Sequence, residues 1–344
     1  RLPRLAAGVP RLPLATLPTP VSEHGVRAGG KRRIVLVKHD ELSGPLYGGN
    51  KVRKLEYLLG HARERGVGRV ATYGAAGSNH ALATALYARR TGFECTCLLS
   101  HQPASAGIDR KLYRHLVNGT ELIRFGGARA DRVAQQRRHL QGRGLALLPM
   151  GGSNWRGTLG FVNAALELAA QCAAGMEPPA EVFVATGTLG TAAGLALGFA
   201  IAGLDVDVHA IRVTDPRIAN AAALARLLAK TTALMRRHDP AVPSDLASRA
   251  RIVLRHDFFG EGYGRSNAST DAAIAFAEDE LGIRLDTTYA GKAMAALEHD
   301  LAAGGLRRPM FWNTCNAVPL PAVPAGFQAG ELPDTFARYF PPAG

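Results

Sequence analysis

Short apolar segments that alternate with helical segments are the feature that most restricts how this chain can fold. A first series of strands is expected at residues 34–38, 69–73, 94–99, 121–125 and 145–148. Helices are expected between and after them, at residues 51 to about 66, 79–91, 108–116, 130–141 and 161–174. Such an alternation is typical of parallel sheets with helices on both faces. The pattern therefore predicts an α/β fold.

A second series of the same kind follows the break at Glu177-Pro178-Pro179. Strands are expected at residues 181–185, 206–213, 252–254 and 310–313, and helices at 191–202, 218–250 with a linker, 270–281 and 291–303. Residues 1–33 are rich in proline and arginine and are expected to form an extended arm with a turn near Gly29-Gly30. Ligands of such folds bind where loops leave the carboxyl ends of the strands.

Composition excludes several classes of protein. The chain has 344 residues, of which 47% are hydrophobic and 20% charged, as in ordinary globular proteins with a large core. The net charge of +13 comes from scattered arginines and favours anionic ligands over a nucleic-acid surface. No nucleic-acid partner is expected.

The cysteines and the hydropathy pattern bear on compartment. Four cysteines at irregular spacing fit neither a disulfide framework nor a zinc site, so no metal is expected. Cys95 and Cys97 alternate along an expected strand and are interpreted as buried free thiols. The sequence has no apolar run of about 18 residues and no signal-peptide pattern. We expect a cytoplasmic enzyme without a membrane partner.

A lysine at the start of a helix is the first candidate for chemistry. Gly48-Gly49 precede Asn50-Lys51, and apolar residues then recur at helical spacing, at Val52, Leu55, Leu58 and Leu59. The amide dipoles at a helix start and the nearby cation of Lys54 both disfavour a charge on Lys51. A neutral amine can attack a carbonyl, which arginine cannot do. Only seven of the 41 basic residues are lysine, which favours this role over an ordinary solvated helix start.

A glycine-threonine loop is the second candidate. The segment Thr186-Gly187-Thr188-Leu189-Gly190-Thr191 lies between an expected buried strand and a helix. Free backbone amides and the positive end of a helix favour an anion at such a place. The loop lacks the Lys-Ser or Lys-Thr of a Walker A motif and the three-glycine Rossmann spacing. A single phosphate is therefore the expected ligand, and a simple tight turn is the alternative.

Other loops carry polar residues that have both a functional and a structural interpretation. Ser78-Asn79-His80 either caps the following helix or holds a carboxylate. Tyr263 and Tyr289 stand in loops framed by glycine, where a tyrosine can relay a proton or simply pack. A lysine combined with a phosphate cradle and carboxylate-holding loops indicates pyridoxal 5'-phosphate, whose ring withdraws electrons once a lysine holds it.

These motifs together resemble the family of pyridoxal-phosphate lyases that contains D-cysteine desulfhydrase and 1-aminocyclopropane-1-carboxylate deaminase. The resemblance extends from about Pro20 to about Pro319. Its most specific part is the sequence Gly-Gly-Asn-Lys-Val-Arg-Lys-Leu-Glu-Tyr at 48–57, with support from Ser78-Asn79-His80, residues 186–191, Gly-Tyr-Gly at 262–264 and Tyr-Ala-Gly-Lys-Ala at 289–293. It implies the tryptophan-synthase-β-like fold, also called PLP fold type II.

The resemblance also implies domains, an assembly state and residue roles. A larger PLP-binding domain would comprise residues 1–51 and 164–344, a smaller inserted α/β domain residues 52–163, and the protein would be a homodimer. Lys51 would bind the cofactor covalently and Lys54 would lie near its phosphate. Asn79 and Thr314 would contact the cofactor ring. The cofactor phosphate would be bound by Thr186, Gly187, Thr188, Leu189, Gly190 and Thr191. The substrate would be contacted by Ser78, Asn79, His80, Tyr263 and Tyr289. Of these, Ser78, Tyr263 and Tyr289 would join Lys51 in catalysis.

Within the family, two features favour elimination from a D-cysteine-like substrate to pyruvate, ammonia and sulfide. Ala290 stands where the deaminases carry a glutamate, and Ser-Asn-His resembles the desulfhydrase branch. There are also departures: Gly77 replaces a glutamine, and Cys315-Asn316 replaces Gly-Gly. Because these positions border the expected ring and carboxylate sites, deaminase-type ring opening and a PLP- or amino-acid-binding protein without turnover stay open as alternatives.

Overall fold

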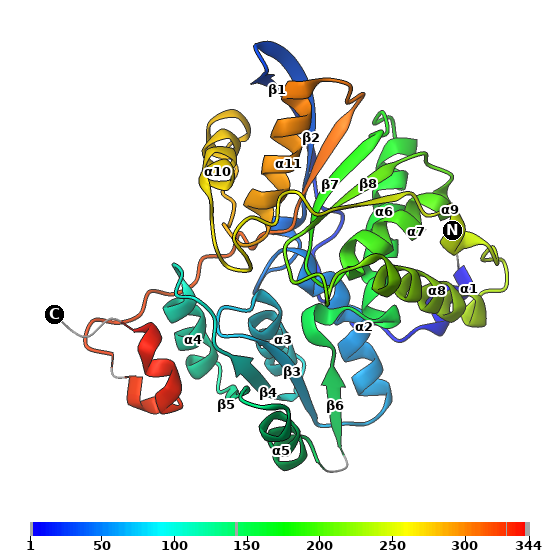
Figure 1. Ribbon diagram of the computed structural model, residues 1–344. Coiled ribbons are helices and arrows are strands. Elements are labelled where there is room, and N and C mark those ends of the chain that lie inside the picture. The colour runs from blue at the N-terminus through cyan, green and yellow to red at the C-terminus, as the bar shows by residue number, and fades with distance from the viewer. Residues whose placement is uncertain (1–2, 142–143, 328, 341–344) are drawn as a thin grey trace.

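The computed structural model describes residues 3–141, 144–327 and 329–340, and it contains two sheets (Figure 1). The larger sheet has the strand order β1-β2-β10-β7-β8-β9. Its strands are β1 (Val21–Ala28), β2 (Lys31–His39), β7 (Glu181–Thr186), β8 (Asp207–Arg212), β9 (Ile252–Arg255) and β10 (Pro309–Asn313). All neighbouring pairs are parallel except β1 and β2, which are antiparallel.

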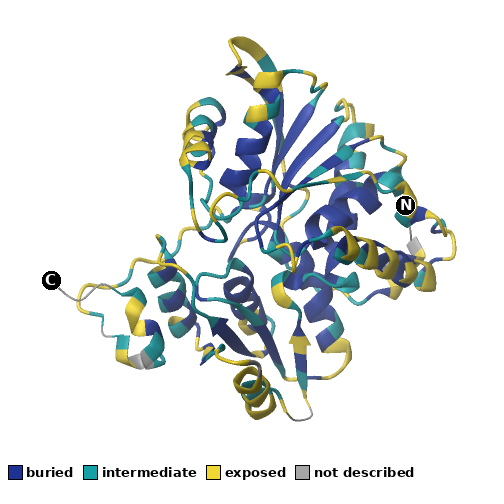
Figure 2. Ribbon diagram, viewed as in Figure 1, coloured by how far each residue is buried: buried dark blue, intermediate teal, exposed yellow. Residues whose placement is uncertain are grey.

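Helices cover both faces of the larger sheet. They are α6 (Trp155–Ala173), α7 (Gly190–Ala202), α8 (Ala221–His238), α9 (Leu246–Arg249), α10 (Ala268–Leu281) and α11 (Ala290–Ala303). Apolar side chains of α10 and α11 pack on one face, and those of α6 and α7 pack on the other. The central strands are buried on both sides, as Figure 2 shows. This explains why their sequences are continuously apolar rather than alternating.

The smaller sheet is entirely parallel and has the order β5-β4-β3-β6. Its elements are β3 (Arg69–Ala75), β4 (Glu94–Ser100), β5 (Glu121–Arg124), β6 (Leu145–Leu148), α2 (Asn50–Glu64), α3 (Asn79–Arg90), α4 (Ile108–Val117) and α5 (Arg129–Leu140). Helices α2, α3 and α4 share one hydrophobic cluster with this sheet, and α5 lies on its other face. The predicted α/β class, with parallel sheets flanked by helices, is confirmed.

The N-terminal segment differs from the expected extended arm. It contains a short helix, α1 (Pro3–Gly8), and the edge strand β1, which forms a hairpin with β2. Gly29 and Gly30 have φ angles of +57° and +73°, which explains why two glycines stand at this turn. The strand was missed because most of its residues are exposed or half-buried, so it lacks a clear apolar pattern.

Helix α6 begins six residues before the predicted start. Asn154 caps it by accepting hydrogen bonds from the amides of Arg156 and Gly157. Gly160 hides the helical pattern, but it is needed because a Cβ there would collide with the carbonyl group of Arg53 on α2. The glycine therefore lets α6 approach the helix that carries Lys51.

The remaining elements are short. The part of the chain that the structure describes also contains the 3-10 helices η1 (Asp40–Leu42), η2 (Met150–Gly152), η3 (Ala329–Glu331) and η4 (Asp334–Tyr339). Within the described ranges, no helix is both long enough and apolar enough to cross a membrane.

Candidate active site

Lys51 lies in the first turn of α2, as predicted, at the end of strand β10. Gly49, two residues before Lys51, has a φ angle of +81°. A Cβ on Gly49 would collide with the carbonyl oxygens of Thr314 and Cys315, which follow β10. Glycine is thus required for the start of α2 to lie against the carboxyl end of the larger sheet.

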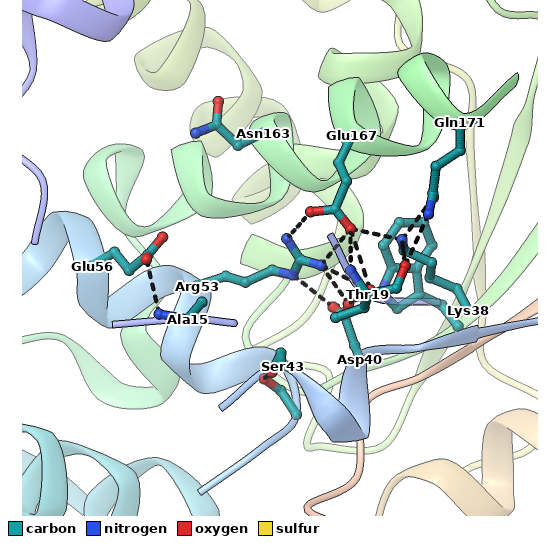
Figure 3. Close-up of polar contacts among 12 residues, drawn as sticks. Ala15, Thr19, Lys38, Asp40, Ser43, Arg53, Glu56, Asn163, Glu167 and Gln171 are labelled. Carbon is teal, nitrogen blue, oxygen red and sulfur yellow. Dashed lines mark hydrogen bonds and ion pairs between the residues drawn. The ribbon is translucent and has the colours of Figure 1, made fainter. Parts of the chain in front are cut away.

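A buried ion network fixes the start of α2 (Figure 3). Arg53 donates hydrogen bonds to Asp40 at 2.7 and 3.0 Å and to Glu167 at 2.9 Å. Lys38 donates to the same Glu167 at 2.7 Å. The backbone oxygen of Asp40 accepts from the amide of Gly49 at 2.8 Å. Because the network holds the backbone on both sides of Lys51, we infer that it sets the position of this lysine.

Burial lowers the pKa of Lys51 to about 8, although the carboxylate of Asp286 opposes the shift. The sequence predicted the direction of this shift from the helix start and the charge of Lys54, whereas burial is the largest cause. The charges of Lys51 and Lys54 repel each other, which adds to the effect of burial on Lys54. The Nζ atom of Lys51 lies 5.9 Å from the centre of the Tyr289 ring. A substantial fraction of this amine is neutral near pH 8.

Polar groups of three segments meet beside Lys54. Its Nζ atom donates to Oγ of Ser153 at 3.1 Å and to the carbonyl oxygen of Gly151 at 3.2 Å. Ser153 Oγ is 2.7 Å from Oγ1 of Thr188 and accepts from the amide of Gly190 at 3.3 Å. Burial, and then the charge of Lys51, lowers the pKa of Lys54 well below its ordinary value. A cation, two hydroxyls and a helix N-terminus thus converge on one spot, which suits an anion.

The loop from Thr186 to Thr191 borders this expected anion site beside Lys54. Leu189 has a φ angle of +68° and is the N-cap residue of α7. The Thr191 hydroxyl accepts from the side chain of Asn50 at 3.0 Å, which ties the loop to the start of α2. The buried Thr186 hydroxyl has no hydrogen-bond partner within the described parts of the chain. A Cβ on Gly187 would lie 3.3 Å from the ring of Tyr289.

The Ser78-Asn79-His80 segment lies at the start of α3, and its three side chains differ in their surroundings. The Ser78 hydroxyl caps α3 by accepting from the amide of Ala81 at 3.2 Å. Oδ1 of Asn79 accepts from the Tyr47 hydroxyl at 2.8 Å and from Nζ of Lys111 at 2.7 Å. These two donors orient the Asn79 amide so that its NH₂ group is free to donate elsewhere.

His80 is buried and does not line the main cavity. A Cβ on Gly152 would lie 3.1 Å from its ring. Burial, and then the charges of Lys51 and Lys54, lowers the pKa of His80 well below its ordinary value. The ring is therefore neutral at physiological pH.

A cavity of about 460 Å³ opens between the two sheets. Its lining includes Tyr47, Asn79, Lys111, Tyr263, Asp286, Tyr289, Cys315 and Asn316. The hydroxyls of Tyr263 and Tyr289 are 2.8 Å apart. Burial raises the pKa of both phenols, so both keep their protons at neutral pH. Lys51 and the 186–191 loop do not line this cavity themselves. Tyr289 lines it, and the ring of Tyr289 lies next to Lys51 and Gly187.

The residues after β10 form the opposite wall. Thr314 is half-buried beside Gly49, and the Cys315 thiol donates to Asp286 at 3.2 Å. Asp286 also accepts from the amides of Thr288 and Tyr289 at 2.9 and 2.6 Å. Asn316 accepts from the amide of Gly48 at 2.7 Å. Both departures from Gly-Gly thus make specific contacts at the cavity.

Four residues at the site were not predicted. They are Tyr47, Lys111, Ser153 and Asp286. The scarcity of lysine could have pointed to Lys111, and Asp286 precedes the α11 start as a capping residue often does. Nothing in the sequence links Ser153 to a loop 35 residues away.

These groups fit an aldehyde that carries a phosphate ester. Lys51 offers an amine of lowered pKa. The spot beside Lys54, Ser153 and Thr188 offers donors for a phosphate, and a Cβ on Gly190 would lie only 3.2 Å from Nζ of Lys54. The glycine there keeps room for the anion.

Comparison with known proteins agrees with this fit. Residues 8–310 match the family model described as pyridoxal-phosphate dependent enzyme. The D-cysteine desulfhydrase of Klebsiella pneumoniae is 35% identical over 301 residues, which cover 84% of this chain and 87% of the relative. That of Salmonella schwarzengrund is 35% identical over 305 residues with the same coverage.

A crystal structure of an ACC deaminase homologue is 28% identical and has a TM-score of 0.74. The match covers 91% of this chain and 93% of that one. The family description gives pyridoxal phosphate as the cofactor, and the matches confirm the predicted fold class and the predicted class of enzyme. The chain therefore belongs to the family of pyridoxal-phosphate dependent enzymes.

Proposed function

We propose that this enzyme catalyses α,β-elimination on a small D-amino acid of the D-cysteine type, giving pyruvate, ammonia and sulfide. The observation that carries the proposal is the amine of Lys51, with its pKa of about 8, beside the paired hydroxyls of Tyr289 and Tyr263. The names of the relatives with 35% identity support the substrate class.

The proposed roles follow from the contacts. Lys51 binds the cofactor, and Lys54, Ser153 and the loop from Thr186 to Thr191 hold its phosphate. The NH₂ group of Asn79 donates toward the cofactor ring, because Tyr47 and Lys111 occupy the other end of its amide. Thr314, half-buried beside Gly49, would contact the ring from the end of β10. The Ser78 hydroxyl and the backbone amides of Asn79 and His80 would bind the substrate carboxylate.

The chemistry balances with water as the only co-reactant. The bound cofactor withdraws electrons from the Cα atom of the substrate. The Cα–H bond breaks and its proton passes to the amine of Lys51, its electron pair forms a carbon-carbon double bond, and the electron pair of the Cβ–S bond leaves with sulfur. Protonated phenols at Tyr263 and Tyr289 are suited to donate a proton to the departing sulfide. The released enamine takes up a proton at Cβ to become an imine, and water hydrolyses the imine to pyruvate and ammonia.

A second candidate is ring opening of 1-aminocyclopropane-1-carboxylate, which the solved structure with a TM-score of 0.74 favours. Either activity is compatible with the proposed division into a larger domain (residues 1–51 and 164–344) and a smaller inserted domain (52–163). We also propose that the protein is a homodimer and that it works in a reducing cytoplasm. The four free cysteines support this compartment.

The test is an absorbance spectrum followed by a substrate panel. We expect the purified protein to show the band of lysine-bound cofactor, and Lys51→Ala to abolish it, whereas Lys31→Ala at an exposed position leaves it intact. D-cysteine should release sulfide and pyruvate in equal amounts. Turnover of 1-aminocyclopropane-1-carboxylate alone would favour the second candidate. A cofactor band without turnover of any substrate on the panel would refute both.

A further inference from the structure

A half-buried lysine that the proposed function uses only to orient Asn79 lines the cavity. Nζ of Lys111 donates to the carbonyl oxygen of Gly77 at 3.0 Å and to Oδ1 of Asn79 at 2.7 Å. An ammonium group has three N–H bonds, so one donor remains for another acceptor. Lys111 also lines the 460 Å³ cavity.

Gly77, whose carbonyl oxygen contacts this lysine, leaves room for the side chains of Ile108 and Gln102. A Cβ at position 77 would lie 3.1 Å from Cγ1 of Ile108 and 3.2 Å from the amide of Gln102, which is tighter than ordinary contact. The Gly77 amide donates to Oε1 of Gln102 at 3.0 Å, and its carbonyl accepts from Lys111. The resemblance predicts a glutamine at position 77. In this chain the polar groups there come instead from the amide of Gln102, before α4, and from Lys111, on α4.

The charged groups of the cavity are mostly cationic. Arg110 and Arg284 line it together with Lys111, and Asp286 is the single carboxylate in its lining. Asp286 already accepts from two backbone amides and the Cys315 thiol, so it does not pair with Lys111. Burial lowers the pKa of Lys111, although Asp286 and Cys315 oppose the shift. This half-buried lysine has no ion-pair partner among the residues that the structure describes, and an anionic ligand would supply one.

We propose that Lys111 determines specificity by binding a negative charge on the side chain of the substrate. The favoured substrates would then be small amino acids whose β-substituent is itself an anion, such as a sulfonate or a phosphate. The backbone amide of Ser78 donates to the carbonyl oxygen of Ala75, so the α-carboxylate, which every amino acid has, would bind the amides of Asn79 and His80. This inference rests on the proposed elimination and changes only the β-substituent that the site prefers.

Binding is measured first, because it does not depend on turnover. Aspartate and alanine carry no β-leaving group and differ by one side-chain carboxylate. Calorimetry on the cofactor-loaded protein measures the binding of both enantiomers of each. We expect aspartate to bind on the order of 10- to 100-fold more tightly than alanine. Lys111→Met should remove the difference and Lys111→Arg should keep most of it. Lys31→Met, at an exposed position, is the matched control.

Turnover is measured next with cysteate and O-phosphoserine against β-chloroalanine and cysteine. The two anionic substrates separate a sulfonate preference from a phosphate preference. Lys111→Met should lower kcat/KM for anionic substrates on the order of tenfold or more beyond its effect on the neutral ones. If Lys111→Met does not fold, Arg284→Gln at the exposed rim should shift the preference in the same direction by a smaller factor.

Equal binding of aspartate and alanine by the wild-type protein would overturn the inference. An equal loss on all substrates in Lys111→Met would also overturn it, because the lysine would then act only through Asn79 or the shared carboxylate. Absence of elimination from every substrate, with preserved tight binding of aspartate, would refute the proposed function and leave the charge preference standing.

Discussion

The hydroxyl of Tyr263 lies 2.8 Å from that of Tyr289, whose ring centre is 5.9 Å from Nζ of Lys51. The two phenols come from loops 26 residues apart, and they form a chain from the buried amine to the cavity. Tyr289 therefore lies between the amine that would bind the cofactor and the cavity that would hold the substrate.

Removal of the Tyr289 hydroxyl should slow the reaction without releasing the cofactor. We expect Tyr289→Phe to lower kcat about 100-fold, as is usual for loss of a positioned proton donor. The absorbance of bound cofactor should not change. Tyr263→Phe should have a smaller effect, because Tyr289 stays in place. Tyr73→Phe removes a hydroxyl on β3 that accepts from Gln136 on α5, far from the proposed site, and is the control, with unchanged kcat.

The pKa of Lys51 predicts how cofactor capture depends on pH. Below about pH 8 the amine is mostly protonated, and only the neutral form attacks the aldehyde. The rate at which the cofactor-free protein takes up pyridoxal phosphate should rise about tenfold per pH unit up to pH 8 and level off above it. Stopped-flow absorbance measures this rate. A rate still rising at pH 10, as for a free lysine side chain, would contradict the lowered pKa.

Lys54 and Ser153 should contribute to cofactor affinity through the phosphate. Lys54→Met removes the cation and Ser153→Ala removes a hydroxyl that bridges Lys54 and Thr188. We expect each variant to weaken pyridoxal phosphate binding on the order of 10- to 100-fold. Binding of pyridoxal, which lacks the phosphate, should change little. Equal losses for both ligands would mean that the residues do not bind the phosphate.

The buried network behind α2 should be essential for stability. Arg53 is 1% exposed and pairs with Asp40 and Glu167. Arg53→Met would leave the buried carboxylate of Asp40 and the half-buried one of Glu167 with fewer partners, and we expect a loss of about 3 to 5 kcal/mol in the free energy of unfolding. Urea titration measures it. Arg217→Met breaks an exposed ion pair with Asp215 and should leave the urea midpoint unchanged.

The same network predicts sensitivity to acid. Burial alone would raise the pKa of Glu167, but hydrogen bonds and charges of Arg53 and Lys38 lower it from 4.5 to about 2. Because the folded state binds the proton less well than the unfolded state, the stability from Glu167 is complete above pH 4.5 and is lost as pH falls toward 2. Glu167→Gln should therefore show a smaller decline in unfolding free energy between pH 5 and 3. An identical decline would rule out this role.

The sequence by itself determined the order of strands and helices, the placement of Lys51 in the first turn of a helix, and the glycine-threonine loop before α7. These features depend on apolar periodicity and on glycine conformation, which act over a few neighbouring residues. The edge strand β1 escaped because its half-exposed residues carry no such pattern.

Only the tertiary structure decided which side chains share the site and how their pKa values shift. Ser153, which follows the smaller sheet, contacts Thr188, which follows β7 of the larger sheet, and Lys111 on α4 contacts Asn79 on α3. Burial is the largest cause of the lowered pKa of Lys51. Burial and charge interactions depend on segments far apart in the sequence that pack together, so no local pattern could have predicted them.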